Sequence, residues 1–478
     1  MDSKITRNYL YNLSYQMLSL FAPLITTPYV SRILGAEGVG TYSYTISIVG
    51  YFSTVAALGI GTYGQLKISE VRDDKEKVSR AFIEVIVTRL VTTSICLLFY
   101  VVFIFLFGGV NKKLYAILSL NIIASAFDIS WFLQGLEEFK KTVLRNYIIK
   151  ILSIVLTFIL VNDSNDLFMY ALILQGSVLF GNATLWIGLK RYIPSVKDIQ
   201  VHFRENLKKS FVYFIPSMAL TLYAYLDKTM IGVLSGSAAE NGYYEQALKI
   251  QQIAMAVITS LGTVIMPRMA YMFKKNDING IKIILRKSSS ITMMFTIPMM
   301  LGLIAISDVL IPWFLGDDFT PSIQILKVLS LLILINGLVE FYGKQVLIPV
   351  GMQIEYNIIT VVGVICNAIL NYFLISHFNT IGACYASVLS ALIILVLLAN
   401  KSRRYFDFRQ TIKSFFKYLF AGCVMFGGIS LFNIPQLSPV VIMFCKVVIG
   451  AIVYFVVLLI EREEILWEFI NKFRFNVS

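Results

Sequence analysis

The sequence has few charged residues, and this scarcity sets its class. Asp, Glu, Lys and Arg make up 14% of the 478 residues, whereas apolar residues make up 57%. Soluble domains carry about 25% charged residues, so a soluble globular protein is excluded. Apolar runs of about 20 residues, the length that crosses a hydrocarbon core of about 30 Å, recur along the chain. The composition therefore predicts an all-α polytopic membrane protein.

The sequence also has few residues that bind metals or form disulfides. Its five cysteines fall within apolar runs without a Cys-x-x-Cys spacing, and its histidines are His202 and His377. We therefore expect no metal site and no disulfide framework, and cysteines that act as small buried apolar residues. The first apolar run lacks a small-residue cleavage motif, so we expect it to stay in the mature protein.

Fourteen apolar runs are long enough to span a bilayer. They lie near 10–32, 40–62, 82–107, 114–135, 144–161, 166–189, 210–232, 242–266, 288–313, 323–344, 354–376, 380–400, 412–432 and 438–460. With a cytoplasmic N-terminus, most of the 41 lysines and arginines fall on the inner side. The outer links then hold Arg32, Lys112, Lys113 and Lys327. This asymmetry predicts that both termini are cytoplasmic.

The net charge of +13 does not indicate a nucleic-acid partner. The basic residues lie in short links between apolar runs, as orientation in a bilayer requires. The two most basic links, 190–209 and 401–411, are expected to attract anionic lipids of the inner leaflet.

A hairpin motif occurs twice. The segment PYVSRILG at 28–35, followed by Gly38 and Gly40, is answered by MIGVL at 230–234 and then Gly242. A repeated hairpin indicates a repeated half. The first and seventh runs cross in the same direction, so we predict two parallel six-helix lobes plus two extra C-terminal helices. The predicted division is an N-terminal lobe over 1–190, a basic cytoplasmic linker over 191–209, a C-terminal lobe over 210–400, and a second linker, the last two helices and a tail over 401–478.

These residues resemble a known family. The segments that carry the resemblance are TPYVSRILG at 27–35 with Gly38 and GTY at 40–42, DKTMIG at 227–232, and Asp128 with Trp131 and Gln134-Gly135. They are similar to the polysaccharide transporters, the Wzx-type flippases of the multidrug/oligosaccharidyl-lipid/polysaccharide exporter superfamily. The resemblance extends over essentially the whole chain.

The resemblance implies a function. Such a protein moves an undecaprenyl-diphosphate-linked oligosaccharide from the inner to the outer leaflet of the bacterial cytoplasmic membrane by alternating access. Its two lobes enclose a cavity, and its last two helices are similar to those that form a lipid-tail groove in lipid II flippases. The expected partners are the lipid-linked substrate and, downstream, the polysaccharide polymerase and export machinery.

Charged residues within the spans are candidates for the binding site. A charge at mid-bilayer costs about 2.5–3.5 kcal/mol and usually faces a cavity or another charge. A diphosphate supplies a reason to keep cations there, because Arg and Lys bind phosphate oxygens. The candidate head-group ligands are Arg32, Arg89, Lys150, Lys249 and Lys446.

Other interpretations of the same charges stay open. Arg32 at a span end also fits an interfacial anchor, and Lys150 fits a side chain that reaches the inner surface. Glu245 and Lys249 are four residues apart on one helix face, so they also fit a simple ion pair.

The sequence has no phosphate-binding Gly-x-x-x-x-Gly-Lys-Ser/Thr loop, so we expect coupling to a proton or sodium gradient and no cofactor. The candidate coupling carboxylates are Asp128, Asp227 and Glu245. We expect no catalytic residue and no enzyme, because a membrane glycosyltransferase or polymerase would need a large outer loop or a set of catalytic carboxylates. A lipid II flippase and a cation-coupled multidrug antiporter of the same superfamily remain alternatives.

Overall fold

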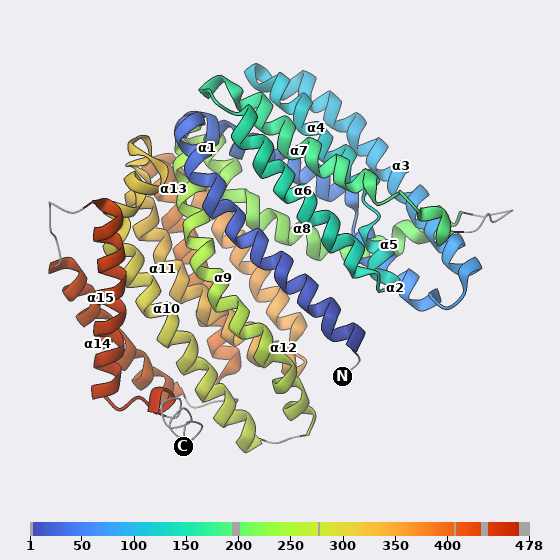
Figure 1. Ribbon diagram of the computed structural model, residues 1–478. Coiled ribbons are helices and arrows are strands. Elements are labelled where there is room, and N and C mark those ends of the chain that lie inside the picture. The colour runs from blue at the N-terminus through green and yellow to red at the C-terminus, as the bar shows by residue number, and fades with distance from the viewer. Residues whose placement is uncertain (1–2, 194–200, 276–277, 406–407, 432–437, 468–478) are drawn as a thin grey trace. The chain divides into compact units, whose positions relative to one another are not determined.

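The computed structural model describes residues 3–193, 201–275, 278–405, 408–431 and 438–467 (Figure 1). Within these ranges all regular structure is helical and there is no strand. The contacts divide the chain into two compact units, Met1–Gly242 (unit 1) and Tyr243–Ser478 (unit 2). Residues 194–200 of the predicted linker, 406–407 of the second linker and 468–478 of the predicted tail lie outside the described residues.

Unit 1 is built from eight main helices and the start of a ninth. They are α1 (Ser3–Ala57), α2 (Ile60–Val71), α3 (Lys75–Phe107), α4 (Lys112–Phe127), α5 (Ser130–Gly135), α6 (Phe139–Leu160), α7 (Leu167–Thr184), α8 (Phe203–Leu234) and the first residues of α9 (Ala238–Lys274). Short 3₁₀ helices at Gly109–Asn111, Ser164–Asp166 and Leu189–Arg191 lie in the links. Because α8 packs on α1, α2 and α3, the boundary between the units falls at Gly242. The two lobes predicted for 1–190 and 210–400 stay a prediction.

Unit 2 continues α9 and adds the remaining helices. They are α10 (Ile278–Leu315), α11 (Ser322–Glu340), a π-helical turn at Phe341–Leu347, α12 (Ile348–Val350), α13 (Gln353–Ser402), α14 (Phe408–Leu431) and α15 (Pro439–Ile460). Another 3₁₀ helix, Asp317–Phe319, follows α10. The helices α14 and α15 pack on each other and on α10.

Ten helical segments among the described residues are long and apolar enough to cross a membrane. Two of them, Phe21–Val71 and Gln353–Ser402, are 51 and 50 residues long. A straight helix of that length would measure about 75 Å, more than twice the hydrocarbon thickness of about 30 Å. The chain breaks instead at Gly35, with φ of 64°, and at Asn379, with φ of 50°. Gln353–Ser402 therefore contains the two predicted spans 354–376 and 380–400, and Phe21–Val71 contains the span 40–62 and the end of the span 10–32.

The break in α13 makes a hairpin. An added Cβ on Gly382 would lie 2.1 Å from the carbonyl oxygen of Leu374, and Asn367 Nδ2 donates to Ser387 Oγ across the turn at 3.4 Å. The predicted spans 354–376 and 380–400 are thus its two arms. Two further predicted spans, 210–232 and 242–266, lie in α8 and α9, which are not among the ten apolar segments. The all-helical multi-pass class is confirmed, while the count of fourteen and the lobe arrangement stay predictions.

One predicted span is interrupted. We expected a continuous helix over 114–135, but α4 ends at Phe127 and α5 begins at Ser130. Asp128 between them has an extended backbone, with φ of −75° and ψ of 105°. Its Oδ1 accepts a hydrogen bond from the backbone N–H of Ser130 at 2.9 Å. The short polar side chain thus forms a local turn with the backbone at the break between the two helices.

An aspartate carboxylate also accepts backbone hydrogen bonds at the solvent-exposed start of α3. Asp74 precedes α3, and its Oδ1 accepts from the backbone N–H groups of Glu76 at 3.0 Å and Lys77 at 3.2 Å. The hydrogen bond from Lys77, followed by others to the same carboxyl group, holds the pKa of Asp74 below its ordinary value. The sequence Asp-Lys-Glu-Lys therefore begins α3 with an N-cap.

The two copies of the repeated glycine motif meet within unit 1. An added Cβ on Gly40 would lie 1.7 Å from the carbonyl oxygen of Ala238, and one on Gly242 would lie 2.1 Å from that of Ala36. Likewise, an added Cβ on Gly232 would overlap the ring of Tyr44, at 2.1 Å from Cδ2. The absence of side chains thus lets α1 cross the first turn of α9 with backbone against backbone.

Candidate functional site

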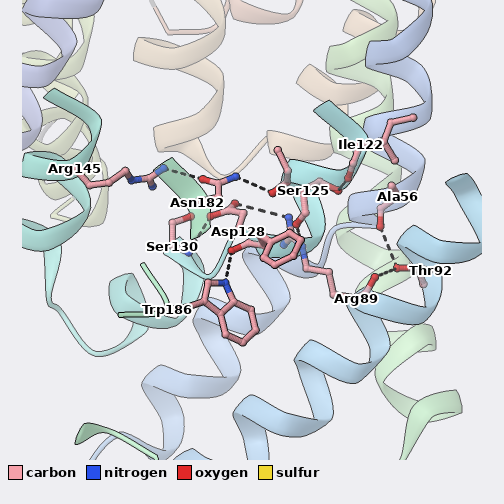
Figure 2. Close-up of polar contacts among 12 residues, drawn as sticks. Ala56, Arg89, Thr92, Ile122, Ser125, Asp128, Ser130, Arg145, Asn182 and Trp186 are labelled. Atoms are coloured by element: carbon pink, nitrogen blue, oxygen red, sulfur yellow. Dashed lines mark hydrogen bonds and ion pairs between the residues drawn. The ribbon is translucent and has the colours of Figure 1, made fainter. Parts of the chain in front are cut away.

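Arg89 lies midway along α3 and is 4% exposed. Its Nε donates to the carbonyl oxygen of Ser125, near the end of α4. Its Nη2 lies 3.7 Å from Oδ2 of Asp128, the residue at which α4 ends. Figure 2 shows the side chain reaching from α3 to this helix end. Arg89 is therefore enclosed by protein and has two acceptors.

Two other side chains bind the same helix end. Asn182 Nδ2 donates to the carbonyl oxygen of Ala124 at 2.8 Å, and Trp186 Nε1 donates to that of Phe127 at 2.8 Å (Figure 2). The last carbonyls of a helix have no partner within the helix and carry partial negative charge. In apolar surroundings such groups must be satisfied by protein. The donors come from Arg89, Asn182 and Trp186. These side chains therefore stabilise the break between α4 and α5.

A polar pocket lies beside this cluster in unit 1, with a volume of about 390 Å³. It is lined by α1, α4, α6, α7 and α8. The lining residues are Tyr42, Ile46, Gly50, Asn121, Arg145, Asn146, Ile149, Lys150, Ser153, Leu174, Gln175, Ser177, Val178 and Tyr225. Most of these side chains are polar, which is unusual for a cavity formed by membrane-spanning helices.

A chain of hydrogen bonds orders one wall of the polar pocket. Ser53 Oγ donates to Asn121 Oδ1 at 2.6 Å, and Asn121 Nδ2 donates to Gln175 Oε1 at 2.7 Å. Gln175 Nε2 then donates to the hydroxyl of Tyr42 at 2.9 Å. The chain links α1, α4 and α7. It fixes the orientation of both amides, whose remaining capacity can meet ligand hydroxyl groups.

Two cations and two tyrosine rings complete the polar pocket. Arg145 and Lys150 both come from α6, and Arg145 Nη1 donates to Asn182 Oδ1 at 2.7 Å. The ring of Tyr225 occupies space next to Gly50, where an added Cβ would lie 2.4 Å from its Cε2. The pocket thus offers positive charge, fixed amides and aromatic surface to one ligand.

The structure brings only some of the predicted site residues together. Within unit 1, Arg89 contacts Asp128, Lys150 lines the polar pocket, and Arg32 is exposed on α1. Asp227 lies half-buried on α8, near Tyr51, which receives or donates a hydrogen bond at 3.1 Å to Thr229.

The remaining predicted residues belong to unit 2. Lys249 Nζ lies 3.4 Å from Glu245 Oε1 on α9, which confirms the ion pair that their spacing predicts. Lys446 is 8% exposed on α15, on the face that packs against α14. The roles of all eight residues in binding or coupling stay predictions.

Of the residues that line the polar pocket, the sequence predicted only Lys150 as a site residue. Tyr42, Asn121, Arg145 and Gln175 are among those it did not predict. Asn121 and Gln175 each stand alone within an apolar run, and that isolation was a usable signal, because an uncharged amide in a membrane helix also needs a partner. Arg145 lies six residues after the first residue of α6 and one residue inside the predicted span, which began at 144. A basic residue at a span end is commonly an anchor, so the sequence did not distinguish its position.

Comparisons with known proteins agree with this architecture. The family described as "Polysaccharide biosynthesis protein" matches residues 5–273, more than half of the chain. A candidate O-antigen transporter of Escherichia coli (strain K12) is 24% identical over 386 residues, which cover 79% of this chain and 92% of that protein. A candidate low-salt glycan biosynthesis flippase of Haloferax volcanii is 26% identical over 449 residues, 91% of each chain.

A solved structure has the same fold. The lipid II flippase MurJ in an inward closed conformation superposes with a TM-score of 0.74 at 17% identity, over 96% of this chain and all of that one. The relatives are described as transporters and flippases, in agreement with the prediction that the chain is not an enzyme. Because the family match covers more than half its length, the chain belongs to the polysaccharide biosynthesis protein family, which confirms the resemblance of its 27–42 segment.

Proposed function

We propose that the chain is a flippase that moves an undecaprenyl-diphosphate-linked oligosaccharide from the inner to the outer leaflet of the bacterial cytoplasmic membrane by alternating access. The polar pocket of unit 1 is the observation that carries the proposal. It combines Arg145 and Lys150 with a row of amides and hydroxyls inside a membrane-spanning bundle. Cations suit the diphosphate, and amides and hydroxyls suit sugar hydroxyl groups.

In this proposal the intramembrane cations have different tasks. Lys150 and Arg145 meet the diphosphate in the pocket, whereas Arg89 holds the end of α4 and so positions Asn121 and Asn182 around it. Arg32, Lys249 and Lys446 are proposed contacts of the substrate at other stages of its passage. Surrounding anionic lipids, the polymerase and the export machinery are proposed partners.

The energy source is proposed to be a proton or sodium gradient. A coupling carboxylate must exchange a cation as the cavity alternates. Asp128 and Glu245 each have a cationic side chain within 4 Å in this conformation. Release of that partner in the opposite conformation would free the carboxylate for an ion. Asp128→Asn, Asp227→Asn and Glu245→Gln should each be tested for transport that no longer responds to collapse of the gradient.

The main test is a strain that lacks the gene. The expected result is accumulation of a lipid-linked oligosaccharide on the inner leaflet, with loss of a surface polysaccharide and restoration of both by the wild-type chain. The double variant Arg145→Gln, Lys150→Gln should not restore export, whereas Lys140→Gln, an exposed neighbour on α6, should. Absence of any accumulated lipid-linked oligosaccharide would contradict the proposal.

Lipid II is the second candidate cargo, and the fold similarity to a lipid II flippase over 96% of the chain favours testing it. The measurement is whether the chain supports growth when the host's own lipid II flippase is depleted. Rescue would assign lipid II as cargo. Altered drug resistance without an effect on polysaccharide would instead support the multidrug antiporter.

A further inference from the structure

A second cavity of unit 1 lies on the other side of Arg145. It is a groove between α6 and α7 with a volume of about 400 Å³, here called the α6–α7 groove. Its lining residues are Leu133, Lys141, Leu144, Arg145, Ile148, Ile149, Phe180, Thr184, Leu185, Ile187, Leu189 and Tyr192. Arg145 and Ile149 also line the polar pocket. These two residues therefore form the wall that separates an apolar groove from a polar cavity.

The charge of the α6–α7 groove favours an anion. Its lining includes Lys141 and Arg145 and no Asp or Glu. Lys141 Nζ lies 4.6 Å from the ring centroid of Tyr192, to whose hydroxyl it also donates. Lys141 and Arg145 are four residues apart on α6, so they lie on one face about 6 Å apart along the axis. Two cations on one helix face can both contact a ligand that carries two linked phosphate groups.

The rest of the α6–α7 groove suits a hydrocarbon chain. Leu144, Ile148 and Phe180 are 55%, 57% and 59% exposed. Leu144 lies between the two cations on α6, Ile148 follows them along the same helix, and Phe180 precedes Gly181, which packs against Arg145 and Ile149. The groove therefore pairs a phosphate-binding end with an apolar track, as a lipid with an anionic head requires. In the orientation predicted from the Lys and Arg distribution, the cationic end of α6 lies at the inner leaflet.

The crossing of α6 and α7 explains how one side chain reaches both cavities. An added Cβ on Gly181 would lie 2.9 Å from Ile149 Cγ1 and 3.3 Å from Arg145 Cδ. The Arg145 side chain thus passes over Gly181, and its guanidinium group is held by Asn182. A side chain larger than glycine at position 181 would occupy the space through which the Arg145 side chain passes.

We infer that the α6–α7 groove is the loading site for the cargo's carrier, a polyprenyl diphosphate of the inner leaflet. The diphosphate binds to Lys141 and Arg145. The hydrocarbon chain binds to Leu144, Ile148 and Phe180. Because Arg145 lines both cavities, the diphosphate can remain bound to it while it moves into the polar pocket. This inference rests on the proposed function. It adds a lateral site for the lipid that is separate from the cavity that receives the sugars.

Photocrosslinking of the full chain tests this inference. Benzoylphenylalanine replaces Ile148, or Ile151 as an exposed control on the same helix that does not line the groove. The protein is placed in phosphatidylcholine vesicles that contain undecaprenyl diphosphate without sugar. We expect capture of undecaprenyl diphosphate at 148 about tenfold above that at 151. Arg145→Gln should lower it about tenfold, the effect of losing one charge-assisted hydrogen bond, whereas Arg145→Lys and Lys140→Gln should retain most of it.

Three results would overturn the inference. One is equal capture at 148 and 151. Another is capture that Arg145→Gln leaves unchanged. The third is capture of added phosphatidylglycerol in place of undecaprenyl diphosphate, which would make the groove a site for resident phospholipid. Because the probe carries no sugar, these outcomes are separate from the proposed function, which fails only if no lipid-linked oligosaccharide is moved.

A steric variant supports the same test if Arg145→Gln does not fold. Ile148→Trp fills the groove without removing a charge, and Ile151→Trp is its matched control on lipid-facing surface. We expect Ile148→Trp to lower both capture at Phe180, measured with benzoylphenylalanine at that position, and transport by about tenfold. Equal transport by the two tryptophan variants would overturn the inference.

Discussion

Two arginines of unit 1 lie close to the end of α4, but their surroundings differ. Arg89 is 4% exposed and binds Ser125 and Asp128. Arg145 is half-buried, binds Asn182, and lines two cavities. Asn182 links Arg145 to the end of α4, because its Oδ1 accepts from Arg145 and its Nδ2 donates to the carbonyl oxygen of Ala124. Arg89 thus satisfies acceptors of the protein itself, whereas Arg145 also borders cavities that a ligand can fill.

The comparison shows that depth in the membrane does not by itself identify a binding residue. A buried cation is costly unless it is paired, and a broken helix supplies acceptors as effectively as a substrate does. The distinction lies in whether a side chain borders a cavity. The first three of the following predictions test this difference between the Arg89 cluster and the polar pocket, and the fourth concerns a helix start outside both.

The largest effect is expected at the Arg89 cluster. Arg89→Met leaves Asp128 and the carbonyl of Ser125 without their cation, so we expect the free energy of unfolding to fall by about 3–5 kcal/mol. The melting temperature of the detergent-purified protein measures it. Adding Asp128→Asn should recover part of the loss, since the uncompensated charge is then absent. An Arg89→Met protein as stable as wild type but without transport would instead assign Arg89 to substrate binding.

A smaller loss of stability is expected in the polar pocket. Asn121→Leu removes the acceptor of Ser53 and the donor to Gln175, and we expect a loss of about 1–3 kcal/mol. Asn146→Leu is the control, because Asn146 lines the same pocket but its side chain has no hydrogen-bond partner among the residues that the structure describes. Equal melting temperatures for the two variants would show that the hydrogen-bond chain does not order the wall.

Lys150, one of the two cations that line the polar pocket, should affect transport rather than folding. Lys150→Gln is expected to slow export about tenfold, equivalent to about 1.4 kcal/mol, with little change in melting temperature. Lys150→Arg should keep most of the activity because the charge remains. The measurement is the rate at which lipid-linked oligosaccharide reaches the outer leaflet. A loss of stability in Lys150→Gln like that of Arg89→Met would remove the distinction between the two sites.

The smallest effect is expected at the exposed start of α3. Asp74 caps this helix, and its lowered pKa means that its carboxylate stabilises the folded state above the ordinary value of 3.8. This contribution is lost as the pH falls through the still lower folded-state pKa. The difference in melting temperature between wild type and Asp74→Ala should therefore shrink between pH 6 and pH 3. Asp73→Ala, at a neighbouring 99% exposed side chain, is the matched control, and a difference as large as that of Asp74→Ala would contradict the assignment of the cap to Asp74.

Much of the fold could be predicted from the sequence because it follows from hydrophobic length. Runs of about 20 apolar residues must be helices in a bilayer, and the positive φ angles at Gly35 and Asn379 fall between predicted spans. The pairing of Glu245 with Lys249 followed from helical spacing alone. The repeated glycine motif was also recognised, although the sequence did not show that its two copies touch.

The candidate site was less predictable because its residues meet only in three dimensions. Asn121 and Gln175 are 54 positions apart and come together through the packing of α4 on α7. The break at Asp128 was missed for a related reason. Apolar length predicted one span over 114–135, whereas the helix ends where Arg89, Asn182 and Trp186 satisfy its carbonyls. Such tertiary partners override local helix propensity.

The contact of Gly40 with Ala238 has a consequence for the alternating access proposed above. Gly40 and Gly242 each lie directly against main-chain atoms, of Ala238 and Ala36, so neither position has a side chain to reorder if the two segments part in the proposed alternating access. A contact of this type can form and break without interlocked side chains. Its reversibility depends on two hydrogen atoms in the place of methyl groups, so the smallest possible enlargement of either glycine would hold the segments apart.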